Sequence, residues 1–303
     1  MKTKDKELTI FTPGLDSRSL KMDYFDIDNM VIVGGTGSGK TTMLNTIVKS
    51  MIDSNDSKYL QLVMFDGGNN VCESPFFNQR RITPYTELQR IFIMPSMFYH
   101  EVYNLLHTLL TVASSVVQPV GEEWNVVTGH RKLVPGVIVV IINEFEALPE
   151  YLRYLIRFII RRKSPQVKFI LTGQSEKPFK DFISDIRYRV TTRVDDEASN
   201  VLLKCNIGSR CADKYGTCWF YDSEEPDCYS KHIINFTPDS LLNRMMKTYS
   251  SNKESNSLVL AKYYNVRYDK KDYDMTDQCM EDIYKVNIKA LLEDFLKIAN
   301  KEV

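Results

Sequence analysis

A glycine-rich stretch near the start of the chain has the residue types and the spacing that bind a phosphate chain. It reads Gly34, Gly35, Thr36, Gly37, Ser38, Gly39, Lys40, Thr41 and Thr42. The stretch fits the pattern G-x-x-x-x-G-K-[ST] and lies between the apolar run Met30 to Val33 and a helical pattern that continues to Val48. Backbone N–H groups of such a loop turn toward the phosphates, and the following helix points the positive end of its dipole at the same oxygens. These residues therefore predict a P-loop, the phosphate-binding loop of a nucleotide site.

Two residues of this loop are expected to act through their side chains. Lys40 would reach the β- and γ-phosphates of ATP, and the Thr41 hydroxyl would hold Mg²⁺. The structural alternative is a glycine-rich surface turn that fits the pattern by chance. Chance seldom also supplies a buried strand before the turn and a helix after it, so we expect ATP and Mg²⁺ as cofactors.

A second chemical pair follows the longest apolar run of the chain. This run, Val137 to Ile142, is rich in β-branched residues and is followed by Asn143 and Glu144. Such a run suits a central parallel strand that is buried on both faces. A polar pair at its end is the Walker B arrangement, in which one side chain serves the water shell of Mg²⁺ and a carboxylate polarises the attacking water. We assign the metal role to Asn143, which lacks the charge of the usual Asp and should hold Mg²⁺ more weakly, and the water-polarising role to Glu144. The alternative is that the pair only caps a structural strand and the next helix.

Two further strands are expected to end in polar side chains at the same edge of the sheet. The strand Leu60 to Phe65 is followed by Asp66, and the strand Lys168 to Leu171 is followed by Gln174. Open α/β sheets bind ligands at the carboxyl ends of their strands. Gln174 can hydrogen-bond both a γ-phosphate and the attacking water, so we assign it a sensor role.

A helix that opens at Pro149 carries regularly spaced arginines. Arg153, Arg157 and Arg161 fall four residues apart on one face, and Arg162 and Lys163 close the last turn. Cations are stabilised near a helix C-terminus, so a solvated face is one interpretation. The functional interpretation is that one of these arginines reaches the γ-phosphate bound to a neighbouring subunit.

The composition limits what surrounds these residues. With 303 residues, 43% hydrophobic and 26% charged, the chain can form one large α/β domain with an appendage or two small domains. No apolar run approaches the ~20 residues that span a bilayer, and no secretory signal is evident, so we expect a cytoplasmic protein. The 39 basic residues balance the 39 acidic ones, so any contact with nucleic acid must be a local patch.

Strands that alternate with helices along the chain predict a mostly parallel sheet covered on both faces. Besides the elements above, the pattern predicts strands at Arg90 to Met94 and Tyr188 to Val194, and helices at Tyr99 to Val117 and Ala198 to Lys204. The polar stretch from Gln118 to Pro135 is expected to be a long connection.

Five segments together resemble the motor domain of the FtsK/SpoIIIE DNA translocases, within the HerA/FtsK ATPase superfamily. They read VIVGGTGSGKTT, LVMFDGG, VIVVIINEFEAL, VKFILTGQ and IRYRVTTRVDDEASNVLL, in this order. The resemblance covers roughly residues 25 to 236 and implies a RecA-like P-loop NTPase fold. It also implies an intersubunit arginine among Arg161, Arg162 and Lys163, for which we choose Arg162, and a further catalytic arginine at Arg189. Two positions depart from the family pattern: Asn143 stands for the Walker B Asp, and Gly173 stands for the Thr before Gln174.

Residues 1–236 are therefore expected to form the ATPase motor domain, and residues 237–303 a small helical C-terminal extension. The extension begins with a good helix start, Thr237-Pro-Asp, and ends in an amphipathic helix. It holds as many acidic as basic residues, which favours packing onto the motor or a partner protein over reading DNA.

The resemblance implies a ring, which we expect to be a hexamer, that pumps DNA without reading its sequence. Such a pump would serve a phage, a plasmid or a conjugative element, or would package a viral genome. Two alternatives stay open: an ATPase for protein export like those of type VII secretion, and a degenerate ring member that binds ATP but barely hydrolyses it. His130, Arg131 and Lys132 are the candidate DNA contact, although an inconsequential surface loop explains that cluster equally well.

Overall fold

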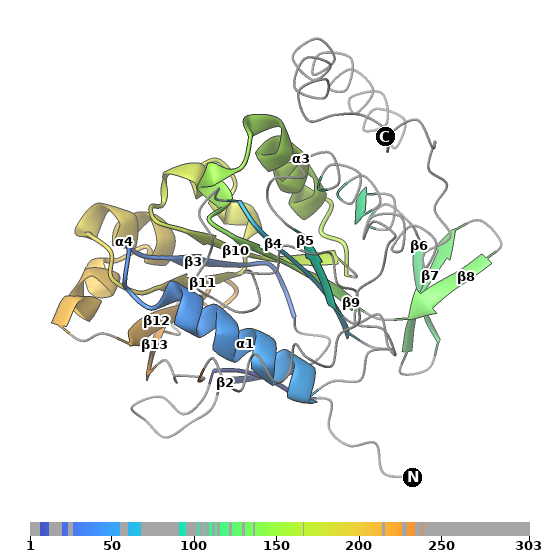
Figure 1. Ribbon diagram of the computed structural model, residues 1–303, viewed down its shortest axis with the longest axis horizontal. Coiled ribbons are helices and arrows are strands. Elements are labelled where there is room, and N and C mark those ends of the chain that lie inside the picture. Colours follow the sequence, from blue (N-terminus) through green and yellow to red (C-terminus); the bar gives the residue numbers. More distant parts are fainter. Residues whose placement is uncertain are drawn as a thin grey trace.

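The architecture is an eight-stranded sheet with helices on both faces, seen in a computed structural model (Figure 1). The structure describes residues 7–11, 20–23, 27–54, 60–67, 91–94, 116–120, 123–128, 131–135, 137–165, 167–213, 216–225 and 229–233, with Pro238 and single helical positions at 102, 106, 109, 110 and 113. The strand order is β13-β12-β11-β3-β10-β9-β4-β5. The order of strands in space thus differs from their order in the chain, as crossover connections through helices require.

Six strands of this sheet run parallel to one another. They are β3 (Met30–Val33), β4 (Leu60–Asp66), β5 (Ile91–Met94), β9 (Val137–Asn143), β10 (Val167–Gly173) and β11 (Tyr188–Thr191). Every residue of β9 is buried, as its continuous apolar run predicted, and so is every residue of β10. The predicted parallel sheet is confirmed. Two antiparallel strands that the sequence analysis did not predict, β12 (Thr217–Asp222) and β13 (Tyr229–Ile233), extend it beyond β11.

The helices divide between the two faces because strand side chains alternate in direction. Helix α3 (Glu150–Arg161) buries its apolar stripe in a core cluster with alternate residues of β3 and β9, among them Val31, Val33 and Val140. Helix α1 (Lys40–Ser54) is also buried, on every side from Met43 to Val48, but its residues lie outside that cluster. Figure 1 shows α1 below the sheet and α3 above it. Shorter elements complete the core: α4 (Asp196–Leu203), η2 (Phe145–Ala147), η3 (Lys177–Phe179), η4 (Ile183–Asp185) and η5 (Asn206–Asp213).

The segment between β5 and β9 corrects two predictions. The helix expected from Tyr99 to Val117 is represented by five buried helical positions that join the α3 face: Val102, Leu106, Leu109, Leu110 and Ala113. Its predicted end is wrong, because Val116 and Val117 already belong to a strand.

The long connection expected from Gln118 to Pro135 is also wrong, because this stretch forms most of a three-stranded antiparallel sheet. We call this unit the appended sheet. It consists of β6 (Val116–Val120), β7 (Glu123–Thr128) and β8 (Arg131–Pro135), with β7 in the middle. The appended sheet lies at the right of Figure 1, beside the start of β9. A third small sheet pairs β1 (Glu7–Phe11) with β2 (Leu20–Asp23), and β1 lies against α1.

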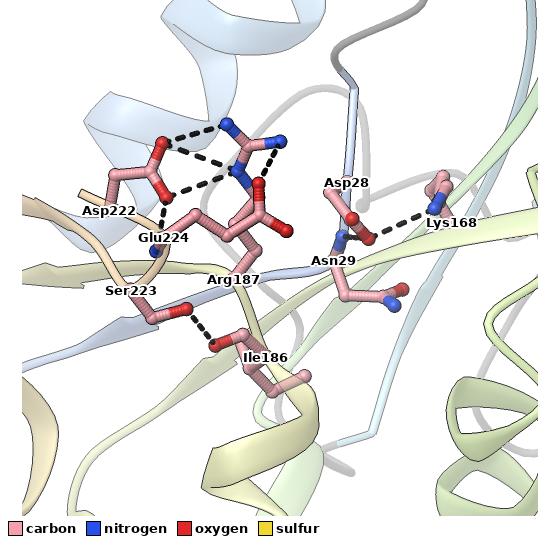
Figure 2. Close-up of polar contacts among 8 residues, drawn as sticks. All are labelled: Asp28, Asn29, Lys168, Ile186, Arg187, Asp222, Ser223 and Glu224. Atoms are coloured by element: carbon pink, nitrogen blue, oxygen red, sulfur yellow. Dashed lines mark hydrogen bonds and ion pairs between the residues drawn. The ribbon is translucent and has the colours of Figure 1, made fainter.

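The amino ends of the parallel strands form one edge of the sheet, here called the amino edge, which is closed by paired charges (Figure 2). Just before β11, Arg187 donates to both carboxylate oxygens of Asp222, at 2.9–3.2 Å, and its other terminal nitrogen lies 2.8 Å from Glu224. Burial lowers the pKa of Arg187, but the hydrogen bonds to Asp222 outweigh this effect and the net pKa lies above the ordinary value. Lys168 of β10 lies 3.0 Å from Asp28, which precedes β3. These contacts tie β3, β10, β11 and β12 together at this edge.

The predicted extension, residues 237–303, lies outside the described residues apart from Pro238. None of the helices that the structure describes has the length and apolar character needed to cross a membrane.

Candidate nucleotide site

The P-loop lies at the opposite edge of the sheet, the carboxyl edge, where β3 ends. Gly34 N donates to Gly173 O at 3.1 Å, and Gly35 N donates to Arg193 O at 2.9 Å. The loop is thus fixed to the strand ends on both sides of β3. A Cβ atom on Gly34 would collide with the Thr192 hydroxyl and lie 2.8 Å from Ser38 Oγ, so only glycine fits. Gly37 and Gly39 adopt positive φ angles of 73° and 97°, which glycine adopts without strain.

Two hydroxyl groups fasten the base of this loop. Ser38 Oγ and Thr192 Oγ1 lie 2.7 Å apart, and both side chains are buried. Thr192 N also donates to Val33 O at 2.9 Å, which continues the pairing of β11 with β3. The loop is therefore anchored from its strand side, while Thr36 and Gly37 at its tip are exposed.

Lys40 is the first residue of α1, and its ammonium group is folded back onto the loop. Nζ donates to Gly34 O at 2.5 Å and to Gly35 O at 2.9 Å. Burial lowers the pKa of Lys40, while the carboxylates of Glu146 and then Glu144 act in the opposite direction. A cation that is held by carbonyl oxygens at a phosphate-binding loop can exchange them for phosphate oxygens. Thr41 and Thr42 follow in the first turn of α1, where both are half-buried.

A relay through Thr172 connects the two Walker B residues. Glu144 N donates to Thr172 Oγ1 at 3.0 Å, and Thr172 Oγ1 donates to Asn143 Oδ1 at 2.9 Å. Asn143 is only 4% exposed, so its amide is held from within the sheet. Glu144 has a left-handed backbone, with φ 52° and ψ 54°, and precedes η2. A non-glycine residue in this conformation at a strand end is typical of functional positions.

Gln174 follows β10 at the same edge and faces the tip of the P-loop. Thr36 Oγ1 donates to Gln174 Oε1 at 3.4 Å, and the Gln174 side chain is exposed. The sensor position predicted from the sequence thus lies beside the loop. On its other side Gln174 N donates to Glu146 Oε1 at 2.6 Å.

Glu146 is the residue of this site that the sequence analysis missed. Its Oε1 accepts from Gln174, whereas its Oε2 is buried without a hydrogen-bond partner among the described residues. Burial raises the pKa of Glu146, although the hydrogen bond from Gln174 opposes the rise. The available signal was a second carboxylate two residues after Glu144, in the first turn beyond the strand.

A cavity of about 410 Å³ opens between the P-loop and the loop that leads into α4. Gly35, Thr36 and Gln174 line one side, and Arg193, Val194 and Asp195 line another. Asp195 caps α4 by accepting from Ala198 N at 2.8 Å. The cavity adjoins the phosphate loop and has room for the nucleoside part of a nucleotide.

The two arginines assigned catalytic roles do not join this cluster. Arg189 is 3% exposed, and its guanidinium donates to Ile186 O and Leu202 O and lies 5.5 Å from the Tyr221 ring. Burial lowers its pKa. The group would have to leave these contacts to reach a phosphate, so this placement does not support the predicted catalytic role.

Arg162 lies far along α3 from the P-loop of its own chain. Because α3 begins after the carboxyl end of β9 and ends before the amino end of β10, its last turn is near the amino edge. The Arg162 guanidinium lies 4.9 Å from the Phe158 ring. The neighbouring Arg161 bonds to Asp185 and to Asp181 O. A phosphate contact by Arg162 is therefore one that it could make only on another subunit.

The donor set fits a nucleotide triphosphate with Mg²⁺. In the described part of the chain, no group of three His, Cys, Asp or Glu side chains could hold a metal ion alone. Mg²⁺ at a phosphate site needs little more than a hydroxyl, water and phosphate oxygens. Thr41, at the start of α1, and Asn143, at the end of β9, are the residues that would serve it. Asp66 pairs with Asn143 in the β4–β9 register, which confirms that this strand ends at the same edge.

Comparisons with known proteins agree with this geometry. Residues 3–73, which include the P-loop, match the FtsK/SpoIIIE family. A comparison with curated protein sequences finds no match.

Several solved structures share the fold. The cytoplasmic domain of the type VII secretion ATPase EccC from Thermomonospora curvata superposes with a TM-score of 0.57 at 16% identity, over 87% of this chain and 32% of that one. The pCW3 conjugation coupling protein TcpA, in its monomer form with ATPγS, gives 0.51 at 15% identity, over 76% and 67%. EssC from Geobacillus thermodenitrificans (ATPases 2 and 3) gives 0.51 at 13% identity, over 82% and 46%.

The chain spans about a third of the EccC structure. At these identities the structural likeness shows the fold, which is that of RecA-like P-loop NTPases. The family match over residues 3–73 and this fold support a P-loop ATPase domain of the FtsK/SpoIIIE type.

Proposed function

We propose that the chain hydrolyses ATP to drive the movement of DNA through a ring of identical subunits. The observation that carries this proposal is the meeting of Lys40, Glu144 and Gln174 at one edge of the sheet. Lys40 would exchange the carbonyls of Gly34 and Gly35 for phosphate oxygens. Glu144 would accept a proton from, or polarise, a water molecule, and Gln174 would orient that water beside the terminal phosphate. Mg²⁺, when bound, would neutralise phosphate charge.

The ring rests on Arg162. Its position near the amino edge makes it useless to the nucleotide of its own chain but suitable for a neighbour's. ATPase activity should then rise more steeply than linearly with protein concentration. Mixtures of wild type with Arg162→Ala should lose activity in proportion to the mixed interfaces, whereas mixtures with Lys204→Ala, an exposed lysine after α4, should not. Strictly linear activity in a species that stays monomeric with ATP would remove the ring.

The DNA contact is assigned to the tip of the β7–β8 hairpin in the appended sheet. Thr128 of β7 pairs with Arg131 of β8, and Lys132 follows Arg131 in the same strand. A protein with no net charge must attract phosphates through such a local group. The contact is independent of sequence because phosphates carry no sequence information.

The decisive experiment measures ATPase activity with double-stranded DNA, with single-stranded DNA and with no polymer, at low salt. We expect stimulation by DNA that falls as salt rises. Arg131→Ala with Lys132→Ala should lose the stimulation and keep basal hydrolysis. The control pair Lys177→Ala with Lys204→Ala, which are exposed on other elements, should keep both.

Protein export is the second candidate, because the similar structures include a type VII secretion ATPase beside a conjugation coupling protein. Stimulation by a secreted protein and by no nucleic acid would replace the DNA pump with an export motor. ATP binding without measurable hydrolysis under any condition would indicate a degenerate ring member, as the Asn143 substitution allows.

A further inference from the structure

Glu146 occupies a position for which the geometry requires an explanation. A buried carboxylate oxygen without a hydrogen-bond partner costs free energy, so proteins seldom retain one without a use. Here the oxygen is Glu146 Oε2, and it lies at the carboxyl edge, three residues after the end of β9. The other oxygen is not idle, since it fixes the backbone of Gln174 at 2.6 Å.

The space for this carboxylate is created by Gly173. A Cβ atom at position 173 would lie 3.0 Å from Glu146 Oε2 and 2.6 Å from the Phe179 ring. A larger residue there, such as the Thr of the family pattern, would displace both. The glycine and the carboxylate therefore fit together as a pair.

The charges at this edge support the same connection. Glu146 and Glu144 are the two carboxylates whose electrostatic attraction acts on Lys40, and that of Glu146 is the larger. A Walker B strand that ends in Asp-Glu would place two negative charges near the P-loop lysine. This strand ends in Asn143 and Glu144, and Glu146 brings the number of carboxylates back to two.

We propose that Glu146 is a positioning residue that supplies the negative charge that Asn143 lacks, while it holds Gln174 beside the P-loop. The inference rests on the proposed nucleotide site and adds a residue to it. In this arrangement one carboxylate has moved from the strand end to the turn beyond it. Asn143 then serves as an uncharged amide on the side of the ligand, held by the hydrogen bond from Thr172. The region already contains two carboxylates, Glu144 and Glu146.

The test follows the Mg²⁺ concentration needed for half-maximal binding of a fluorescent ATP analogue, which requires no turnover. Four proteins are compared: wild type, Glu146→Gln, Asn143→Asp and the double variant. Loss of a charged group around a metal commonly costs 10–100-fold in metal affinity, so we expect Glu146→Gln to raise the Mg²⁺ midpoint about tenfold. When Asn143→Asp is added to Glu146→Gln, the Mg²⁺ midpoint of the double variant should return to within about threefold of wild type. Glu150→Gln, the same change at an exposed position in the first turn of α3, should leave it unchanged.

A merely structural role of Glu146 predicts an unchanged Mg²⁺ midpoint in Glu146→Gln. Because Gln can still accept from Gln174 N, we expect Glu146→Gln to unfold at or above the wild-type temperature. The inference about Glu146 would be overturned by an unchanged Mg²⁺ midpoint in Glu146→Gln, or by a double variant whose midpoint does not return toward wild type. The proposed function would still stand in either case if wild type binds the nucleotide. If wild type binds no nucleotide at any Mg²⁺ concentration, the inference and the proposed function are both wrong. If Glu146→Gln alone does not fold, the double variant decides, because the proposal requires it to bind with a near-wild-type midpoint.

Discussion

The two edges of the central sheet contain similar polar residues but use them in opposite ways. At the amino edge Arg187, Asp222 and Glu224 bond to one another, and Lys168 pairs with Asp28 (Figure 2). At the carboxyl edge, by contrast, Lys40 rests on backbone carbonyls and one oxygen of Glu146 has no hydrogen-bond partner among the described residues. The amino edge holds strands together, and the carboxyl edge keeps polar groups ready for a ligand.

Backbone geometry separates the edges in the same way. In the part of the chain that the structure describes, the non-glycine residues with positive φ are Glu144, Lys163 and Lys204. Lys163 and Lys204 follow the ends of α3 and α4, where a left-handed residue is common. Glu144 instead precedes a short helix at the nucleotide site. Strain is thus retained where the chemistry is expected.

The largest effect is expected at the carboxyl edge from Lys40→Ala. Loss of a charged donor to the phosphates should weaken ATP binding about a hundredfold or more. The free energy of unfolding should change little, because the hydrogen bonds of Lys40 among the described residues are to Gly34 and Gly35 of its own loop. Fluorescent nucleotide titration measures the binding, with Lys49→Ala in the same helix as the matched control. Equal affinity in Lys40→Ala and wild type would remove the site assignment.

Glu144→Gln should affect hydrolysis alone. Loss of a general base commonly slows a reaction by about 10²–10⁴-fold, while the amide keeps the size of the side chain and leaves nucleotide binding intact. Single-turnover hydrolysis and equilibrium binding, measured on the same preparation, separate these two quantities. A parallel loss of both would mean that Glu144 acts in binding instead.

The amino edge should show the reverse behaviour. Arg187→Ala leaves Asp222 without its bidentate partner, so the free energy of unfolding should fall by about 1–3 kcal/mol. Arg161→Ala, which breaks a more exposed pair with Asp185, should cost about 0–1 kcal/mol. Urea denaturation measures both values. A change in nucleotide affinity in Arg187→Ala would show that the two edges are coupled.

The smallest effect concerns the pH dependence of stability. Burial raises the pKa of Glu146, so the folded chain binds this proton more tightly than the unfolded chain. The free energy of unfolding should therefore fall as pH rises from the ordinary glutamate pKa through the raised one. Glu146→Gln removes that loss, so the variant should match wild type below this window and be more stable above it. Lys40 and Glu144 face the same group and remain in both proteins, so the difference between their unfolding curves at each pH isolates Glu146.

The sequence predicted the central elements because their signals are local. The apolar run Val137 to Ile142 can be buried only on both faces, and the P-loop pattern fixes a strand, a turn and a helix around it. The carboxyl-edge positions of Lys40, Glu144 and Gln174 followed from that order. The structure places all three where these patterns indicated.

The appended sheet was missed because the stretch is polar and was interpreted as a connection. Its prolines would also usually argue against strands. Pro119 lies in β6 and Pro135 in β8, but these are the two outer strands of the sheet, where a missing N–H can be tolerated. Position within a sheet depends on pairing between distant segments, which a local pattern does not contain.

Arg189 and Glu146 show the same limit at the level of side chains. The family resemblance implied a catalytic role for Arg189, yet its charge is satisfied by the carbonyls of Ile186 and Leu202 and by the Tyr221 ring. The Glu146 carboxylate fits in the site because Gly173, on another strand, has no side chain that would collide with it. Both outcomes depend on tertiary contacts.

The join between the appended sheet and the core has a mechanical consequence. Only Gly136 separates β8 from β9, and β9 runs straight to Glu144 over seven residues, a distance of about 23 Å. On either side β9 is paired to β4 and β10 along its length, so it cannot bend or slip easily. A pull on β8 would therefore be transmitted along β9 to Glu144, the residue that we propose polarises water, and a movement of Glu144 would act back along the same strand.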